Sequence, residues 1–62
     1  MNEEKALQII NDLRNKKIME YLVEKKDFMT FRTVLMAQED KKNFVGEAQK
    51  GGNVIYRYVV QK

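Results

Sequence analysis

The spacing of apolar residues near the start of the chain predicts an amphipathic helix over residues 3–14. The apolar positions recur at helical intervals and fall on one side, with polar residues on the other. They are Ala6, Ile9, Ile10 and Leu13, with Leu7 at the margin. Asn2 is a suitable N-cap, and Glu3 and Glu4 complement the positive end of the helix dipole.

Residues 16–25 fit two interpretations. As a helix, they gather Ile18, Met19, Leu22 and Val23 on one apolar face, and as a strand these residues alternate between two faces. A single helix continued from residue 3 would turn this second apolar face to nearly the opposite side, because successive helical residues rotate by about 100°. We therefore expect a break around Asn15 and Lys16, and favour a second helix after it.

Residues 28–37 are also ambiguous. They are rich in β-branched and aromatic side chains, which favour a strand. The alternative is a helix, with Phe28, Phe31 and Leu35 at helical spacing and Thr30 as a cap. The composition favours the strand.

The clearest local signal is a hairpin formed by residues 44–49 and 53–61. The turn Lys50-Gly51-Gly52-Asn53 supplies glycines that accept the positive φ of a tight hairpin. A two-residue turn at Gly51-Gly52 would place Val45 opposite Tyr58 and Phe44 opposite Val59. The second strand then has one face that carries Val54, Tyr56, Tyr58 and Val60, and another that carries Ile55, Arg57, Val59 and Gln61.

These elements predict a single α+β domain over residues 1–62, with one or two N-terminal helices packed on a three-stranded antiparallel β-meander. The alternative is a winged-helix-like fold, in which residues 28–40 form a recognition helix and the glycine hairpin forms a basic wing. The meander has two partly apolar faces, and helix 3–14 covers only one of them. A chain of 62 residues without cysteine buries only roughly 60% of its unfolded surface. We therefore expect a homo-oligomer, most simply a dimer.

The composition argues against catalysis. Cys, His and Ser are all absent, so neither a Ser–His or Cys–His nucleophile pair nor a Cys/His zinc site can be built. No glycine-rich phosphate loop or calcium-loop spacing occurs. We expect no enzyme activity, no catalytic residue, no metal and no cofactor. The chain has no apolar run long enough to span a membrane and no signal peptide, which predicts a cytoplasmic protein with no membrane partner.

The charge favours an anionic partner. The net charge is +3, and the positive residues concentrate in two blocks, residues 14–26 and 41–62. A small homodimeric regulator that binds nucleic acid would use lysines against phosphates, with Lys41, Lys42 and Lys50 expected together at one end of the sheet. Arginines beside tyrosines add charge and base stacking. The predicted nucleic-acid-binding residues are Lys41, Lys42, Lys50, Arg57 and Arg32.

The alternative function is that of a protein-binding adaptor or inhibitor. The second sheet face would then be the contact surface, because aromatic side chains dominate the energetics of protein interfaces. The predicted interaction face consists of Tyr56, Tyr58, Val45 and Val54.

Overall fold

The first helix, α1 (Glu3–Arg14), has the bounds that the apolar periodicity predicts. The structure, a computed structural model, describes residues 1–60. The side chain of Asn2 caps the helix, since its Oδ1 accepts a hydrogen bond from the Lys5 N–H at 2.8 Å. The expected break is also present, because α1 ends at Asn15 and Lys16 adopts a positive φ of 62°.

The helix predicted within residues 16–25 is wrong. The segment contains the short strand β1 (Tyr21–Val23), followed by a single 3-10 turn over Lys25–Asp27. Val23 is fully buried in this strand, and Leu22 beside it is exposed on the other face. The side chains of this segment therefore alternate between two faces, as the strand interpretation requires. The strand is stable because the backbone of β1 pairs with a strand later in the chain.

The strand predicted over residues 28–37 is also wrong, and the helical alternative is correct. Helix α2 (Phe28–Met36) buries Phe31 and Leu35 against the rest of the domain. Packing against α1 and the sheet outweighs the strand propensity of its residues. Its capping residue is Asp27, not Thr30.

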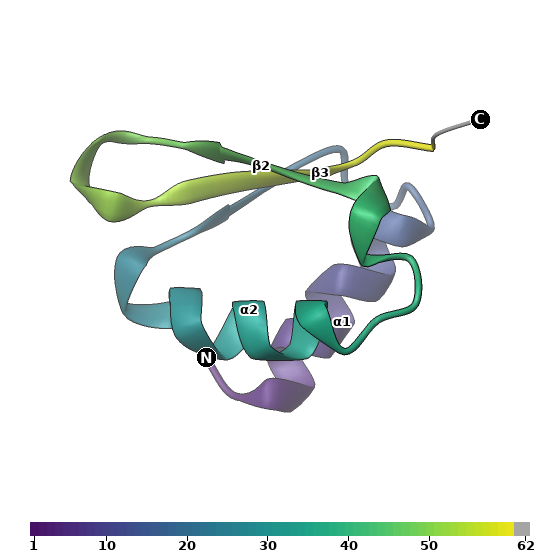
Figure 1. Cartoon of the computed structure of the whole chain (residues 1–62), viewed down its shortest axis with the longest axis horizontal. Coiled ribbons are helices and arrows are strands. Elements are labelled where there is room, and N and C mark those ends of the chain that lie inside the picture. Colours follow the sequence, from purple (N-terminus) through teal and green to yellow (C-terminus); the bar gives the residue numbers. More distant parts are fainter. Residues whose placement is uncertain (61–62) are drawn as a thin grey trace.

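The remaining strands form the predicted hairpin, β2 (Phe44–Ala48) and β3 (Val54–Tyr58). Together with β1 they make a three-stranded antiparallel sheet in the order β1-β3-β2, with β3 in the centre (Figure 1). The α+β class with N-terminal helices is confirmed. The sheet is not a simple meander, because β1 lies next to β3 and the chain crosses from β1 through α2 to the far edge of the sheet.

The hairpin register differs by one residue from the prediction. Phe44 lies opposite Tyr58 and Val45 opposite Arg57. The Gln49 N–H donates to the Asn53 carbonyl at 2.7 Å, so the turn contains three residues, Lys50–Gly52, instead of two. Gly51 and Gly52 both have positive φ, 80° and 84°, as the glycine signal predicts. Gln61, at the end of the predicted strand, lies outside the described residues.

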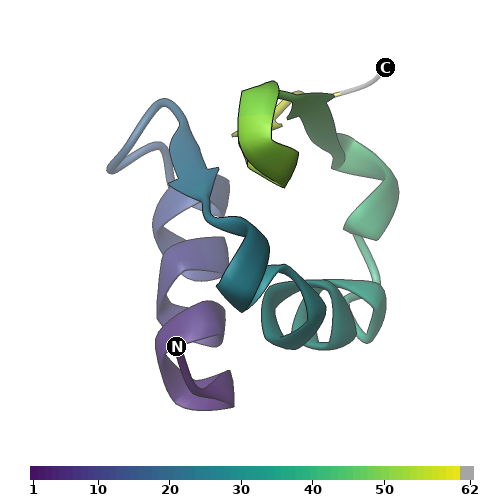
Figure 2. The ribbon, with the colours of Figure 1, turned by 90° about the vertical axis from the view of Figure 1, so that its left-hand side faces the viewer.

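Both helices lie on the same face of the sheet, and no described helix covers the other face (Figures 1 and 2). The core between the two layers contains Ile10, one of the apolar positions predicted for the first helix, together with Phe31 and Leu35. Its buried members are Ala6, Ile9, Ile10, Leu13, Val23, Phe31, Leu35, Phe44 and Tyr56. We call the sheet face that meets this core the inner face and the opposite one the outer face. None of the helices in the described part of the chain has the length and apolar character needed to cross a membrane.

Candidate nucleic-acid interface

The hairpin turn and the 3-10 turn before α2 lie at the same end of the molecule. Figure 2 views this end directly, with the hairpin turn above the 3-10 turn. The Lys25 N–H donates to Oδ1 of Asn53 at 3.0 Å. The Lys25 side chain lies over Gly52 so closely that a Cβ at that glycine would stand 2.9 Å from its Cδ. Two segments far apart in the sequence are thus joined there.

This end carries a group of cations that we call the basic end, formed by Lys25, Lys26, Lys50 and Arg32. All four residues are exposed. Arg32 lies on α2, close enough to the Tyr56 hydroxyl to oppose the rise that burial causes in the pKa of that tyrosine. Within residues 1–60 none of the four takes part in an ion pair. Their positive charge is therefore available to an outside anion.

The lysines predicted to share one end of the sheet are divided between its two ends. Lys41 and Lys42 form the 3-10 turn that leads into β2, whereas Lys50 follows the far end of that strand. The five residues of β2 between them extend over about 17 Å. The prediction that Lys41, Lys42 and Lys50 lie together is wrong, because β2 separates the first two lysines from the third.

Arg57 lies on the outer face of the sheet between two carboxylates. Its Nη1 donates to Glu47 Oε2 at 2.9 Å, and its Nε is 3.5 Å from Glu20 Oε1. The hydrogen bond from Arg57 lowers the pKa of Glu47. The charge of this predicted nucleic-acid contact is thus compensated inside the protein, and it stands on a different surface from the basic end.

The predicted interaction face does not form one surface. Tyr56 is only 7% exposed, and its ring lies 4.9 Å from that of Phe31 in the core. Burial raises the pKa of its hydroxyl. Gly46 makes this position possible, because a Cβ there would be 3.0 Å from Tyr56 Cε1. Val54 and Tyr58 share the inner face with Tyr56, whereas Val45 lies on the outer face.

Sequence inspection missed a polar cluster where α1 meets the segment after α2. Arg14 binds Asp40 with two hydrogen bonds of 2.8 Å, and the Tyr58 hydroxyl donates to the same carboxylate at 3.2 Å. Arg14 also donates to Asn11 at 2.7 Å and to Gln38 at 3.0 Å. The hydrogen bond between them raises the pKa of Arg14 and lowers that of Asp40. These contacts join residues 14, 40 and 58, and the only sequence signal was an arginine on the polar margin of α1.

Among the described residues, no three Asp, Glu, His or Cys side chains gather closely enough to hold a metal ion. The candidate interface consists of surface cations on the 3-10 turn before α2, on the hairpin turn and on α2. Comparison with curated proteins and with solved structures gives no match. Residues 3–57 match a family described as YkzS-like protein, and this span includes every helix and nearly all of the sheet. The chain belongs to the YkzS-like protein family.

Proposed function

We propose that this protein is a small nucleic-acid-binding regulator that contacts phosphates through its basic end. The observation that carries the proposal is the grouping of Lys25, Lys26 and Lys50 around the hairpin turn, with Arg32 on the adjoining helix. Cations that neutralise phosphates supply a large share of the affinity of such proteins, and these four make no ion pair within residues 1–60.

The order of the elements supports the same proposal. A helix followed by a β-hairpin, with an earlier strand completing the sheet, is the arrangement expected for a winged helix. In this analogy α2 occupies the position of the recognition helix, and the hairpin turn that of the wing. The protein departs from that pattern in one respect, since a single 3-10 turn stands where a helix would precede α2. The exposed side of α2 carries Met29, Arg32, Thr33 and Met36.

A dimer would bring two basic ends to one nucleic acid, and the outer sheet face supports this part of the proposal. Leu22, Val45 and Val59 are 47%, 42% and 44% exposed on this face. Ile55 lies opposite Leu22 in the central strand, and the ion-paired Arg57 lies opposite Val45. Apolar side chains gathered on a face without a covering helix favour association with a second copy. The adaptor alternative has less support, because Tyr56 is buried and the other residues of the predicted interaction face are divided between the two faces of the sheet.

The nucleic-acid proposal predicts a change in salt dependence. Replacing Lys25, Lys26 and Lys50 together with glutamine is expected to weaken binding to duplex DNA at low salt. It should also reduce the slope of log affinity against log salt by about two to three units, since each phosphate contact contributes about 0.9. Fluorescence anisotropy over a series of salt concentrations measures both quantities.

The matched control replaces Lys5, Lys17 and Lys41 with glutamine, which removes the same charge from other surfaces. It should keep the parental slope to within about one unit. Equal flattening in both triple variants would show that the attraction is diffuse and would contradict the assigned interface. Absence of binding by the parent to any mixed DNA or RNA at about 100 μM, above ordinary non-specific dissociation constants, would favour the adaptor.

The proposed dimer has its own test. Sedimentation equilibrium at about 100 μM, within the range of ordinary interface affinities, is expected to give a mass above the 7.4 kDa of one chain. Leu22→Glu should return the protein to a monomer, because a charge would be buried without a partner. Met29→Glu, on the other side of the molecule, should leave the dimer intact. A parent that sediments as a monomer would refute this part of the proposal.

A further inference from the structure

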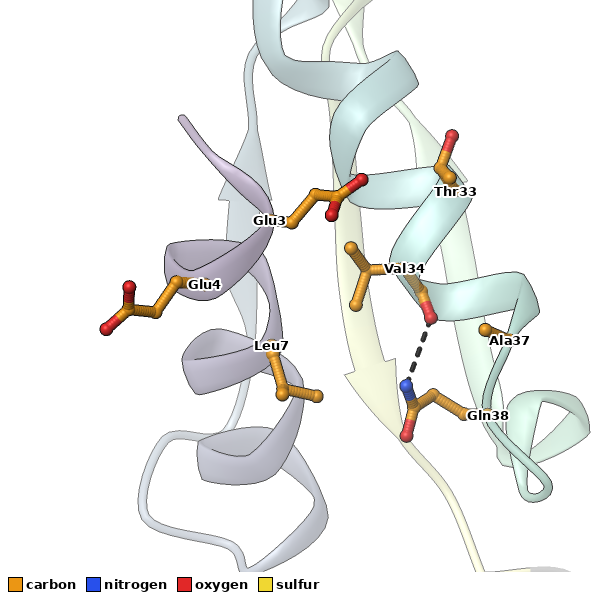
Figure 3. Close-up of a pocket in the computed structure, with 7 residues that line it drawn as sticks. All are labelled: Glu3, Glu4, Leu7, Thr33, Val34, Ala37 and Gln38. Atoms are coloured by element: carbon orange, nitrogen blue, oxygen red, sulfur yellow. Dashed lines mark hydrogen bonds between the residues drawn. The ribbon is translucent and has the colours of Figure 1, made fainter.

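Three hollows lie beside the junction of α1 and α2. A hollow of about 450 Å³ lies at its centre, lined by Leu7 on α1 and by Val34 and Ala37 on the α2 side (Figure 3). A second, of about 390 Å³, adjoins it at Glu3 and Thr33, and a third, of about 410 Å³, adjoins it at Gln38. The three hollows adjoin one another at these shared lining residues, and we call the row that they form the helix seam.

The floor of the helix seam is apolar. Figure 3 shows Leu7 and Val34 directed toward each other across the two helices, with Ala37 beside them. Leu7 is 40% exposed although it adjoins the buried side of α1. Gln38 is held at the edge by a hydrogen bond of 3.1 Å from its Nε2 to the Val34 carbonyl. An apolar side chain from outside would be accommodated above Val34 without displacing a core residue.

The walls of the helix seam are acidic. Glu3 is directed toward α2 and Glu39 lines the opposite end, whereas the Glu4 side chain points away from α2. Among the described lining residues, Asp40 neutralises Arg14 through two hydrogen bonds, and the N-terminal ammonium of Met1 pairs with Asp27 at 3.1 Å. The seam therefore carries a net negative charge on a protein whose total charge is +3.

The negative charge of the helix seam limits which kinds of molecule can bind there. Nucleic acid is excluded from the seam by repulsion, since both surfaces are anionic. A second copy placed seam to seam would face the same carboxylates and is disfavoured for that reason. The complementary occupant has apolar side chains for the floor and cations for the walls.

We infer that the helix seam is a docking site for a basic amphipathic segment of another protein. The helix seam follows α1 from Glu3 to Arg14, a distance of about 16 Å at the helical rise. This length matches about three turns of a bound helix, whose apolar face lies on Leu7, Val34 and Ala37 while its lysines or arginines reach Glu3 and Glu39. The site goes beyond the proposed nucleic-acid interface and uses none of the residues of the basic end.

An unbiased selection tests the chemistry of the occupant. A library of random 12-residue peptides is panned against the full chain and, in parallel, against Leu7→Gln. The parent is expected to enrich peptides that combine Leu or Ile at helical spacing with Lys or Arg, and the variant should not. Enrichment of acidic peptides, or the same peptides on both proteins, would overturn the inference.

Nuclear magnetic resonance then locates the contact. A synthetic amphipathic peptide of Leu and Lys is titrated into the isotope-labelled full chain, beside a peptide in which every Lys is replaced by Glu. The Lys peptide should shift the amides of Leu7, Val34, Ala37 and Gln38 in a saturable way, and the Glu peptide should not. Saturable shifts that fall instead on the outer sheet face, or no saturation, would contradict the assignment.

The charge of the walls is tested with Glu3→Gln combined with Glu39→Gln. This variant should bind the Lys peptide about fivefold more weakly at low salt and should show a smaller salt dependence, as expected for two partly exposed ion pairs. The matched control, Glu20→Gln with Glu24→Gln, removes the same charge elsewhere and should bind as the parent does. Equal weakening in both would show a general electrostatic effect and refute the site. DNA affinity of Leu7→Gln should equal that of the parent, so the two proposals can fail separately.

Discussion

Phe31→Ala is expected to lower the free energy of unfolding by about 3–5 kcal/mol, the range for removing a buried phenylalanine. Phe31 is fully buried and is the largest such side chain, and its ring contacts that of Tyr56 at a centroid distance of 4.9 Å. It lies where α2 meets the central strand, so its loss separates the two layers. A domain of 62 residues has a total stability of only about 3–9 kcal/mol. The variant should therefore lose a large share of its stability, and its midpoint of unfolding should fall accordingly.

The matched control is Met29→Ala on the same helix. Met29 is 67% exposed, and alanine is a good helix former, so its free energy of unfolding should change by no more than about 0.5 kcal/mol. Urea denaturation followed by far-ultraviolet circular dichroism measures both variants. Equal midpoints for Phe31→Ala and the parent would show that α2 does not pack as described.

Asp40→Asn is expected to lower the free energy of unfolding at neutral pH by about 1–2 kcal/mol. Hydrogen bonds to charged groups contribute about 1.5–3 kcal/mol, and the partial exposure of this pair reduces that value. The carboxylate of Asp40 accepts two hydrogen bonds from Arg14 and one from Tyr58, and asparagine cannot reproduce all three. Arg14, also positioned over the Phe44 ring at 5.9 Å, would keep its charge without this partner.

The same substitution should change how stability depends on pH. The hydrogen bond from Arg14 lowers the pKa of Asp40 in the folded protein below its value in the unfolded chain. The stabilisation from its ionised form is thus fully present above the ordinary carboxyl pKa of about 4. It is lost as the pH falls through the lower, folded pKa, where the carboxylate takes up a proton. In Asp40→Asn this part of the acid dependence should be absent.

Asp12→Asn provides the comparison, because the Asp12 side chain makes no hydrogen bond within residues 1–60. Thermal melts of the parent and both variants, from neutral pH to about pH 2, cover the range in which carboxylates titrate. The Asp40 variant and the parent should converge toward the acid end, whereas the Asp12 variant should follow the parent throughout. A constant difference between Asp40→Asn and the parent at every pH would show that the ion pair contributes nothing.

The sequence alone predicts α1 correctly, because the N-cap residue, the charges that complement the helix dipole and the helical spacing of apolar residues all indicate the same helix. Residues 28–37 were not decided by local preference, since Thr, Val and Phe favour strands but Phe28, Phe31 and Leu35 also form a helical face. The segment is helical because α2 packs against α1. The Thr33 hydroxyl is accommodated within the helix by donating a hydrogen bond to the Met29 carbonyl at 2.8 Å. Contacts between distant elements therefore determined this segment.

One residue in the hairpin turn accounts for the error in the predicted interaction face. The glycine pair fits a two-residue turn, but Lys50 joins it to make three. Because side chains alternate along a strand, this shift moved Val45 to the face opposite Tyr56 and Tyr58. The same pairing places both tyrosines against the helices, where Tyr56 becomes part of the core.

The candidate interface was only partly predictable for a similar reason. Lys50 and Arg32 belonged to the predicted set, whereas Lys25 did not. Its position at the hairpin turn follows from the pairing of β1 with β3, which brings residue 25 beside Asn53. No local pattern encodes that contact, because its two partners are 28 positions apart in the sequence.

The central place of β3 determines when this protein can fold during its synthesis. β1 and β2 contact each other only through β3, and β3 is the last of the three strands to leave the ribosome. Until residues 54–58 emerge, the nascent chain holds two short strands without a partner and two helices without the sheet that completes their core. Folding is therefore delayed until the final strand is available, and a chain arrested before it would expose apolar helix faces to chaperones and proteases.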